Sequence, residues 1–480
     1  AAGDTSDSAA GSDSAGDQTE GDDTAGDAAA DDAEQDADTI ANENAETQAG
    51  ATITDLNKLV ELLEANGAES IVLKEDRRGI QSLDVKRSEA FTILSNADAS
   101  LYYDAQIKSI ITGDAKLTSK VKADNGLLSF QGFGSDEHPF EGRIYRSLDD
   151  DSPVELTTDR TVFNNLKLSD QNNKVRIKWV GATSYSAPMV ASKVSGAENS
   201  EESKALIASV DIADPVNADV KDTTSALTAP LLGTTTGNLT ANVTYSLTPT
   251  CSRKNLNANA TGNIGLIGNT VESGTLTVES VTFPNDLASD GTVETSSGNA
   301  GLLVGEVKDG ATLSIGTLTN VPTATIQSAS GSAGGVVGLV GSSTGAMVNV
   351  TEALDLHALT VKGTTASGGF IGKATNLALT IADGITIKPA RSVGDENSAC
   401  SGGVIGDVSF AQGFTVTPNM FDLGDLVTLG ASQRAGALFG VADISNGDIV
   451  VQGGTYKSKF TLPEEVSFNG SYGGLVGKVF

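Results

Sequence analysis

Residues that could carry out acid–base, metal or nucleophilic chemistry are few in this chain. Two histidines, His138 and His357, occur in 480 residues, and they lie far apart in the sequence. A histidine-based zinc site or a serine-type triad would need the fold to bring isolated residues together. The His-Glu-x-x-His signature of zinc proteases is absent from the sequence. We therefore interpret both histidines as structural or surface residues.

Acidic side chains invite a calcium or carbohydrate-cleaving interpretation. They cluster at Asp149-Asp150-Asp151, at Asp395-Glu396, and at Asp422 with Asp425. None of the clusters has the spacing of a calcium loop, and a glycosidase pair would have to converge from distant segments. Solvated turn carboxylates explain them better. The sequence therefore predicts no catalytic, cofactor-binding or metal site and no cofactor.

The only tryptophan, Trp179, lies in the alternating stretch Val175–Val180. An exposed indole ring there would serve as a platform for sugar binding, whereas a buried one would fill the core. We favour core packing.

A short glycine phrase recurs in the second half of the chain and indicates how these residues are positioned. It combines glycines with two adjacent apolar residues, and seven copies read Ile264–Gly268, Gly301–Gly305, Gly334–Gly338, Gly368–Gly372, Gly402–Gly406, Gly436–Gly440 and Gly473–Gly477. Their closing glycines are 37, 33, 34, 34, 34 and 37 residues apart. Such a constant period predicts a solenoid.

Two weaker copies, Ala229–Gly233 and Ala187–Ala191, extend the array toward the N-terminus, so that nine units are visible. The last unit stops three residues after its phrase, without a polar cap. Because a solenoid needs its end covered, we expect the natural protein to continue beyond Phe480.

The segments between the phrases predict strands. They are short alternating runs of Val, Leu, Ile and Thr bounded by Gly, Asn, Asp and Ser, such as Thr275–Phe283 and Ala311–Leu318. A propeller blade needs four antiparallel strands in a longer unit, whereas glycines suit corners where coils approach closely. We therefore predict an all-β fold, a right-handed parallel β-helix with repeats of about 34 residues.

The phrase Gly473–Gly477, followed by a variable and an apolar residue, resembles the GLUG-type repeat of bacterial surface proteins, including adhesins. The resemblance covers residues 230–480 well and 130–230 loosely. It implies an extracellular β-helix protein of bacterial origin but no particular ligand.

The first fifty residues form a separate segment. They hold 15 of the 62 acidic residues and neither Lys, Arg nor an aromatic residue. This composition cannot bury enough apolar surface to offset chain entropy, which predicts a disordered acidic tether at 1–50. The chain begins without Met or an apolar leader, consistent with a secretory signal already removed.

A helix is expected between the tether and the repeats. Thr54-Asp55 would cap it, an apolar face includes Leu56 and Leu63, and Asn66-Gly67 would end it. We interpret 51–120 as an N-terminal cap with the first strands, with a small α+β domain as the alternative, and 121–480 as the β-helix.

Two functions fit this organisation. The first is a secreted or surface-anchored bacterial stalk or adhesin, a monomeric rod that presents a binding surface for a glycan or a protein. The alternative is a polysaccharide lyase or glycoside hydrolase on a β-helix scaffold, which rests on fold analogy. The net charge of −31 argues against nucleic acid as a partner, and no apolar run is long enough for membrane insertion.

Ice binding would need aligned Thr-x-Thr pairs. The pairs at 275/277, 317/319, 323/325 and 415/417 begin 7, 12, 18 and 9 residues after their closing glycines, so we expect no flat array of these pairs.

The two cysteines, Cys251 and Cys400, belong to units about four coils apart. At roughly 4.8 Å per coil their separation exceeds the reach of a disulfide. We predict that they do not pair and that one or both are buried.

Overall fold

A computed structural model describes part of the chain. Side chains are described for residues 161–168, 174–179, 187–199, 201–213, 228–249, 251, 255–424, 428–453, 456 and 471–480, and the backbone alone for the other strands named below. All of them belong to one unit, residues 51–480. The predicted tether at 1–50 and the predicted capping helix at 54–67 lie outside the described residues.

The first strands pair mainly in antiparallel fashion. They are β1 (Ser70–Glu75), β2 (Gln81–Lys86), β3 (Phe91–Ile93), β4 (Leu101–Asp104), β5 (Ser109–Thr112), β6 (Ser119–Asp124), β7 (Leu127–Gln131), β8 (Ile144–Ser147) and β9 (Asp150–Pro153). One six-stranded sheet has the order β1-β2-β5-β4-β8-β9. β4 also pairs in parallel with β8, and β7 pairs in parallel with β10, where the continuous stack of parallel strands begins.

From β10 onward the chain winds through four parallel sheets, which we number 1 to 4 in the order that each coil meets them. Sheet 1 contains β17 (Asn257–Ala260), β20 (Gly291–Thr295), β24 (Ala324–Ser328), β29 (Leu359–Gly363), β33 (Ser392–Val393), β37 (Val427–Gly430) and β41 (Ser458–Thr461). Sheet 2 contains β21 (Ala300–Gly301), β25 (Ser332–Gly334), β30 (Ala366–Gly368), β34 (Cys400–Gly402), β38 (Arg434–Gly436) and β42 (Ser471–Gly473).

Sheets 3 and 4 start earlier in the chain and share one long strand, β31 (Ile371–Ile381). Sheet 3 also contains β11 (Phe163–Lys167), β13 (Ala191–Ser195), β15 (Leu232–Thr236), β18 (Gly268–Val271), β22 (Val304–Val307), β26 (Val337–Val340), β35 (Ile405–Phe410), β39 (Phe439–Asp443) and β43 (Val476–Val479). Sheet 4 also contains β10 (Glu155–Thr158), β12 (Asn173–Trp179), β14 (Lys204–Ile212), β16 (Leu239–Leu247), β19 (Thr275–Thr282), β23 (Thr312–Thr319) and β27 (Met347–Val350).

Two short ladders join later coils between sheets 4 and 1. One pairs β28 (Leu354–Asp355) with β32 (Ile387–Lys388), and the other pairs β36 (Phe414–Val416) with β40 (Ile449–Val451).

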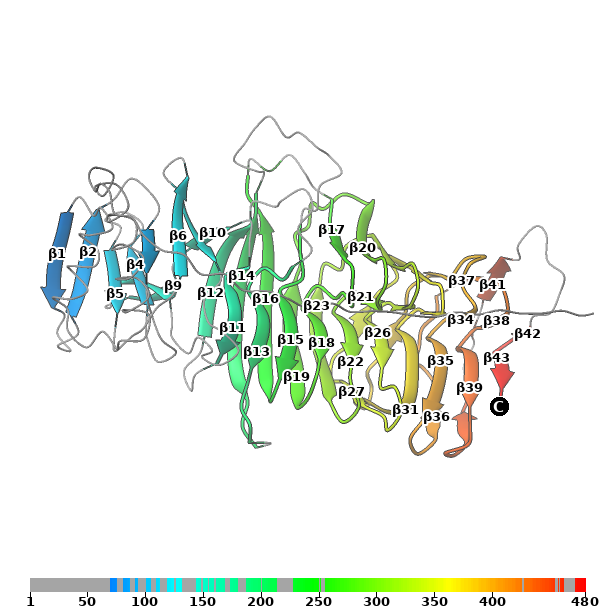
Figure 1. Ribbon diagram of the computed structural model, residues 1–480. Helices are drawn as coiled ribbons and strands as arrows, with labels where there is room; N and C mark the ends of the chain where they lie inside the picture. The colour runs from blue at the N-terminus through cyan, green and yellow to red at the C-terminus, as the bar shows by residue number, and fades with distance from the viewer. Residues whose placement is uncertain are drawn as a thin grey trace, which may run out of the picture. The chain divides into compact units, whose positions relative to one another are not determined.

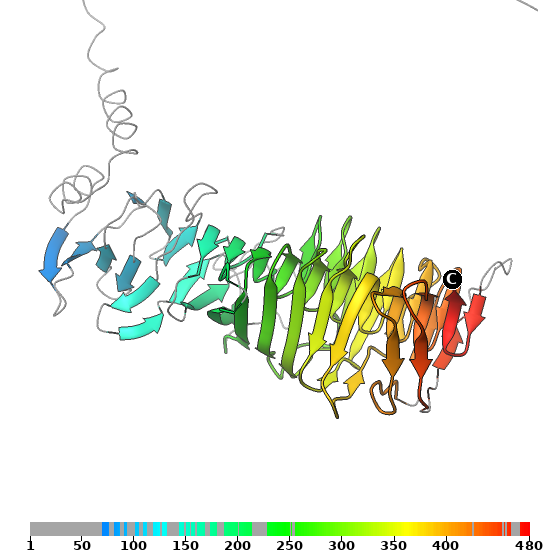
Figure 2. The same ribbon diagram turned by 90° about the horizontal axis from the view of Figure 1, so that it is seen from below.

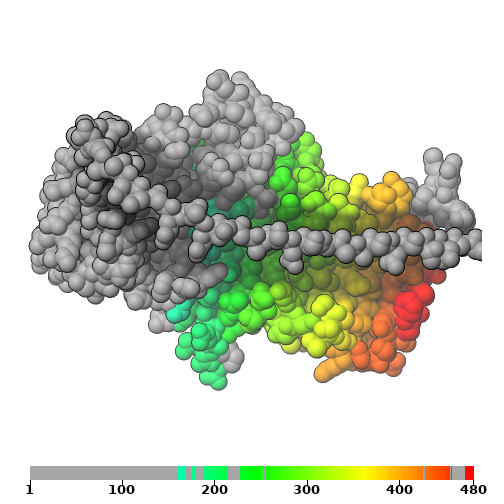
Figure 3. Space-filling view, viewed as in Figure 1, coloured from blue at the N-terminus to red at the C-terminus, as the bar shows by residue number. Residues whose placement is uncertain are grey.

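The prediction of an all-β parallel solenoid is confirmed. From β10 onward, every strand pairing within the described sheets 1 to 4 is parallel, and the seven strands of sheet 1 correspond to about seven turns. Successive coils lie side by side in chain order (Figures 1 and 2), and the space-filling view follows the same order from green to red (Figure 3). No helix occurs in the part of the chain that the structure describes. The right-handed sense of the coil stays a prediction.

The glycine phrase forms the corner between sheets 2 and 3. Its apolar residues stack on one another in successive coils, since Val337 pairs with Ile371 and Ile371 pairs with Ile405. These three side chains are fully buried. The closing glycine has no room for a side chain, because a Cβ on Gly406 would lie 2.5 Å from the Gly372 carbonyl oxygen. Close backbone approach, not positive φ, is therefore the reason for glycine here.

The register corrects the alignment of two copies by one residue. Gly268 pairs with Val304 rather than with the closing glycine Gly305, and Ala191 pairs with Leu232. In both copies the closing residue occupies the corner position that an apolar residue holds in the next coil.

The core runs the length of the stack as columns of apolar side chains. In sheet 4, Leu239, Leu276 and Leu313 occupy equivalent positions in successive coils and are fully buried. Tyr245 stacks on Phe283 at 5.7 Å between ring centroids, and its hydroxyl donates to the carbonyl oxygen of Leu266 at 3.1 Å. Each coil therefore covers the apolar side chains of its neighbours.

Both cysteines are buried thiols, as predicted. The position of Cys400 in sheet 2 is equivalent to Ala366 in the previous coil and to Ser332 in the coil before that. Cys251 precedes β17, so that four coils separate it from Cys400. Burial raises the pKa of the Cys400 thiol to about 12.

We expect Gly406→Ala to lower the free energy of unfolding by about 1–3 kcal/mol, because the added methyl group overlaps the backbone of the neighbouring coil. Gly262→Ala is the matched control, since a Cβ at Gly262 meets no atom within 4 Å. Thermal or urea unfolding measures the difference. Equal stability of the two variants would show that the corners are not closely packed.

A thiol reagent should label neither cysteine rapidly in the native protein, because burial limits access and the high pKa of Cys400 suppresses its thiolate. After unfolding, two thiols per chain should react. Mass spectrometry of the non-reduced protein should find no peptide that links Cys251 to Cys400, and finding that peptide would refute the register.

Candidate binding surface

His357 holds three coils together, in agreement with its interpretation as a structural residue. Its Nε2 atom lies 3.1 Å from the carbonyl oxygen of Asp422, two coils away, and because a carbonyl only accepts, Nε2 carries the hydrogen. Its backbone N–H donates to Asp355 Oδ1, and Asp355 also pairs with Lys388 at 3.0 Å. His138 lies outside the described residues.

The acidic residues whose side chains the structure describes do not converge into one site. Asp395 accepts a hydrogen bond from the backbone of Asn397 and lies 3.9 Å from Lys362, which makes it a turn residue. Glu396 is exposed. Asp149 and Asp425 lie outside the described residues, and only the backbone of β9 is described for Asp150 and Asp151.

Trp179 is buried, with 1% of its surface exposed, so the prediction of core packing is confirmed.

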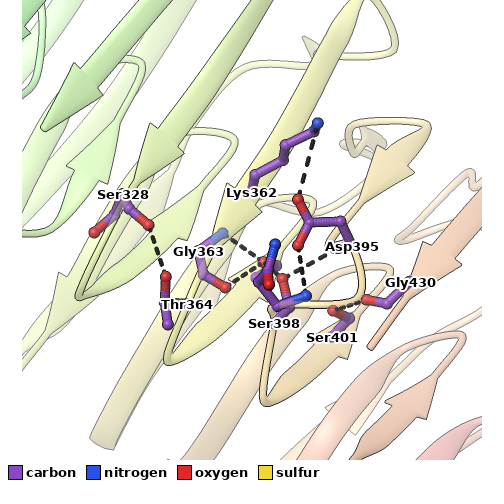
Figure 4. Close-up of polar contacts among 10 residues, drawn as sticks. Ser328, Lys362, Gly363, Thr364, Asp395, Ser398, Ser401 and Gly430 are labelled. Atoms are coloured by element: carbon purple, nitrogen blue, oxygen red, sulfur yellow. Dashed lines mark hydrogen bonds and ion pairs between the residues drawn. The ribbon is translucent and has the colours of Figure 1, made fainter. Parts of the chain in front are cut away.

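A group of buried hydroxyls, at the corner between sheets 1 and 2, was missed by sequence reasoning (Figure 4). Ser367 Oγ accepts from the Gly363 N–H at 2.7 Å and lies 3.1 Å from Ser398 Oγ, while Ser401 Oγ donates to the Gly430 carbonyl. These serines satisfy backbone groups that the corner takes out of the ladders. The sequence contains a signal for them, because Ser367 and Ser401 directly precede the phrase at the position where three other copies carry alanine.

Asp309 connects the corner between sheets 3 and 4 to the next coil. Its carboxylate accepts hydrogen bonds from the backbone N–H groups of Ser342, Ser343 and Gly345 and from both serine hydroxyls. These bonds, that from Ser342 above all, hold the pKa of Asp309 well below its usual range. The residue is a structural clip that sequence reasoning did not find.

The outward face of sheet 4 carries a regular set of polar side chains. Three columns cross β16, β19 and β23, and we call these nine residues the hydroxyl grid: Thr240, Thr277 and Ser314; Asn242, Ser280 and Thr317; Thr244, Thr282 and Thr319. All nine are exposed or half-buried, and the residues between them are buried, except for the exposed Glu279 and the half-buried Leu318.

A β-bulge produces the central column. The register of β16 against β19 shifts between Ala241 and Asn242, so that Asn242 pairs with Ser280 and Glu279 is the extra residue. In β23, Gly316 stands opposite Glu279, and the added Cβ of another residue there would lie 2.3 Å from the Glu279 carbonyl oxygen. Without the bulge, Glu279 and Gly316 would occupy the places of Ser280 and Thr317 in the central column, and the column would lose both hydroxyls.

The Thr-x-Thr pairs do not form one array, as expected. Thr275/Thr277 and Thr317/Thr319 lie on sheet 4 at different columns, whereas Thr325 lies on β24 of sheet 1 and Thr415 on β36. The alignment of hydroxyls in the grid comes from other combinations of residues, which the spacing from the closing glycines did not reveal.

No family model matches the chain, and comparisons with curated proteins and with solved structures give no match. Within the described ranges, no three side chains form a group suited to hold a metal ion. The described residues also include no helix of the length and apolar character that would cross a membrane.

Replacing Asp309 by Ala should lower the melting temperature at neutral pH, because three N–H groups lose their acceptor. Since folding lowers the pKa of Asp309, its stabilisation is present above the ordinary carboxyl pKa of 3.8 and is lost as the pH falls toward the folded pKa.

The difference between wild type and Asp309→Ala should therefore persist at neutral pH and shrink in acid. Asp290→Ala, a change at another exposed turn, serves as the control. A difference that stayed constant down to strongly acidic pH would contradict a role for the Asp309 charge.

Proposed function

We propose that this protein is a secreted or surface-anchored bacterial β-helix protein, a stalk or adhesin that presents a binding surface for a glycan or a protein. The observation that carries the proposal is the in-register stack of coils, because it repeats outward side chains at fixed positions on a stable core. Such repetition suits recognition of an extended partner by many weak contacts.

The acidic segment 1–50 supports the same role. Its composition, rich in acidic residues and without Lys or Arg, is that expected of a tether between the solenoid and a point of attachment. The GLUG-type phrase adds the resemblance to bacterial surface proteins. The alternative, a polysaccharide lyase or glycoside hydrolase, rests on fold analogy alone.

A binding screen of the full chain against glycan and host-protein arrays tests the proposal. We expect retention of at least one glycan or protein, and the same glycans should be recovered uncleaved after incubation with the protein. Release of shorter sugars would favour the enzyme alternative. Binding to neither array would contradict the adhesin role.

A further inference from the structure

We propose that the hydroxyl grid on sheet 4 is the ligand-binding surface and that its ligand is a neutral polysaccharide. The inference rests on the proposed function and names the face and the chemical class of ligand. It follows from four properties of the grid: its hydrogen-bonding groups, its bulge, its spacing and its charge.

The grid offers the groups that recognise sugar hydroxyls. Each Ser and Thr hydroxyl both donates and accepts, as a sugar hydroxyl does. Beside them Asn242 Nδ2 donates to Glu279 Oε2 at 2.6 Å, and Ser280 Oγ donates to Asn242 Oδ1 at 2.8 Å. These bonds fix the amide and the carboxylate in place, while Thr244 and Thr319 are exposed at the edge of the same face.

The carboxylate of Glu279 favours a sugar over an ordered layer of ice. A charged group holds its hydration shell and does not fit a neutral water lattice, whereas a carboxylate is a strong acceptor for sugar hydroxyls. Glu279 is exposed and lies on the grid because of the bulge. Ice binding is therefore an outcome for the test rather than the proposal.

The spacing of the grid fits a polymer better than a single sugar. Neighbouring coils are about 4.8 Å apart, so three coils span about 10 Å along the axis. Along each strand, equivalent outward positions are about 6.6 Å apart. A chain of repeated units would meet similar groups at each coil and gain affinity from several weak contacts.

The charge of the protein selects against anionic polymers. The chain carries a net charge of −31, and Glu279 adds a negative charge at the grid itself. The grid strands β16, β19 and β23 carry no Lys or Arg. The cations of this sheet face, Lys174, Arg176 and Lys178, lie on β12, two strands from the grid, and Arg176 is paired with Asp211 at 3.1 Å. A neutral polysaccharide avoids the repulsion that a uronate polymer would meet.

A matched pair of triple variants tests the assignment. Thr244→Val, Thr282→Val and Thr319→Val remove one column of grid hydroxyls while the side-chain shape and strand preference are kept. The control is Thr292→Val, Thr325→Val and Thr360→Val, which removes an equivalent column from the outward face of sheet 1. Circular dichroism and melting curves check that both full-length proteins fold.

Binding is measured by pull-down and calorimetry with cellulose, xylan and mannan, and with polygalacturonate as the anionic probe. We expect the wild type and the sheet 1 triple variant to bind a neutral polymer with similar affinity. The affinity of the sheet 4 triple variant should be lower by roughly tenfold or more. Negligible binding of polygalacturonate is expected from charge.

Other outcomes overturn the inference in distinguishable ways. Equal binding by all three proteins, or binding of polygalacturonate or a protein alone, would refute the grid or the ligand class and leave an adhesin role standing. If the wild type shaped ice crystals but bound no polymer, the ligand of the grid would be ice and not a polysaccharide. Absence of any binding partner, in this test and in the array screen, would remove both the inference and the proposed function.

Discussion

In-register stacking of the backbone is the constraint on which the rest of this structure depends. Every coil must return to the same position one strand spacing further along the axis, so that its N–H and C=O groups meet those of its neighbours. Corners have little space, and Gly372 and Gly406 allow the strands of sheets 2 and 3 to approach each other there. Where the backbone leaves the ladders, buried hydroxyls such as Ser367 take over the hydrogen bonds.

Stacking also turns single residues into columns. An apolar residue such as Leu276 lies between equivalents above and below, which gives the solenoid a continuous core without large helices or many aromatic rings. The same rule acts on the outside, where Thr282 lies between Thr244 and Thr319. A surface built in this way is regular in two directions because the backbone is regular.

The sequence predicted the repeated corner and the parallel strands, because both are carried by a local pattern of glycine and apolar residues. The repeat pattern aligned Gly268 with Gly305, whereas Gly268 pairs with Val304, because the glycine of that copy lies at a different position in the corner. It did not reveal the hydroxyl grid, because turns of unequal length and the bulge at Glu279 change the distance from each phrase to its strand. The clip at Asp309 was hidden for a similar reason, as its partners lie in the next coil.

Threonine on the outward face of a sheet does not by itself indicate function, because strand preference alone favours it. The residues that depart from this preference are more informative. Asn242 is a poor strand former, and the bulge at Glu279 interrupts a ladder that is continuous on either side of it. Gly316 accommodates that bulge in the next coil. Local departures of this kind cost stability, and these three lie within or beside the grid, whereas the aligned threonines of sheet 1 pair without a register shift. This difference is the physical reason for assigning recognition to sheet 4.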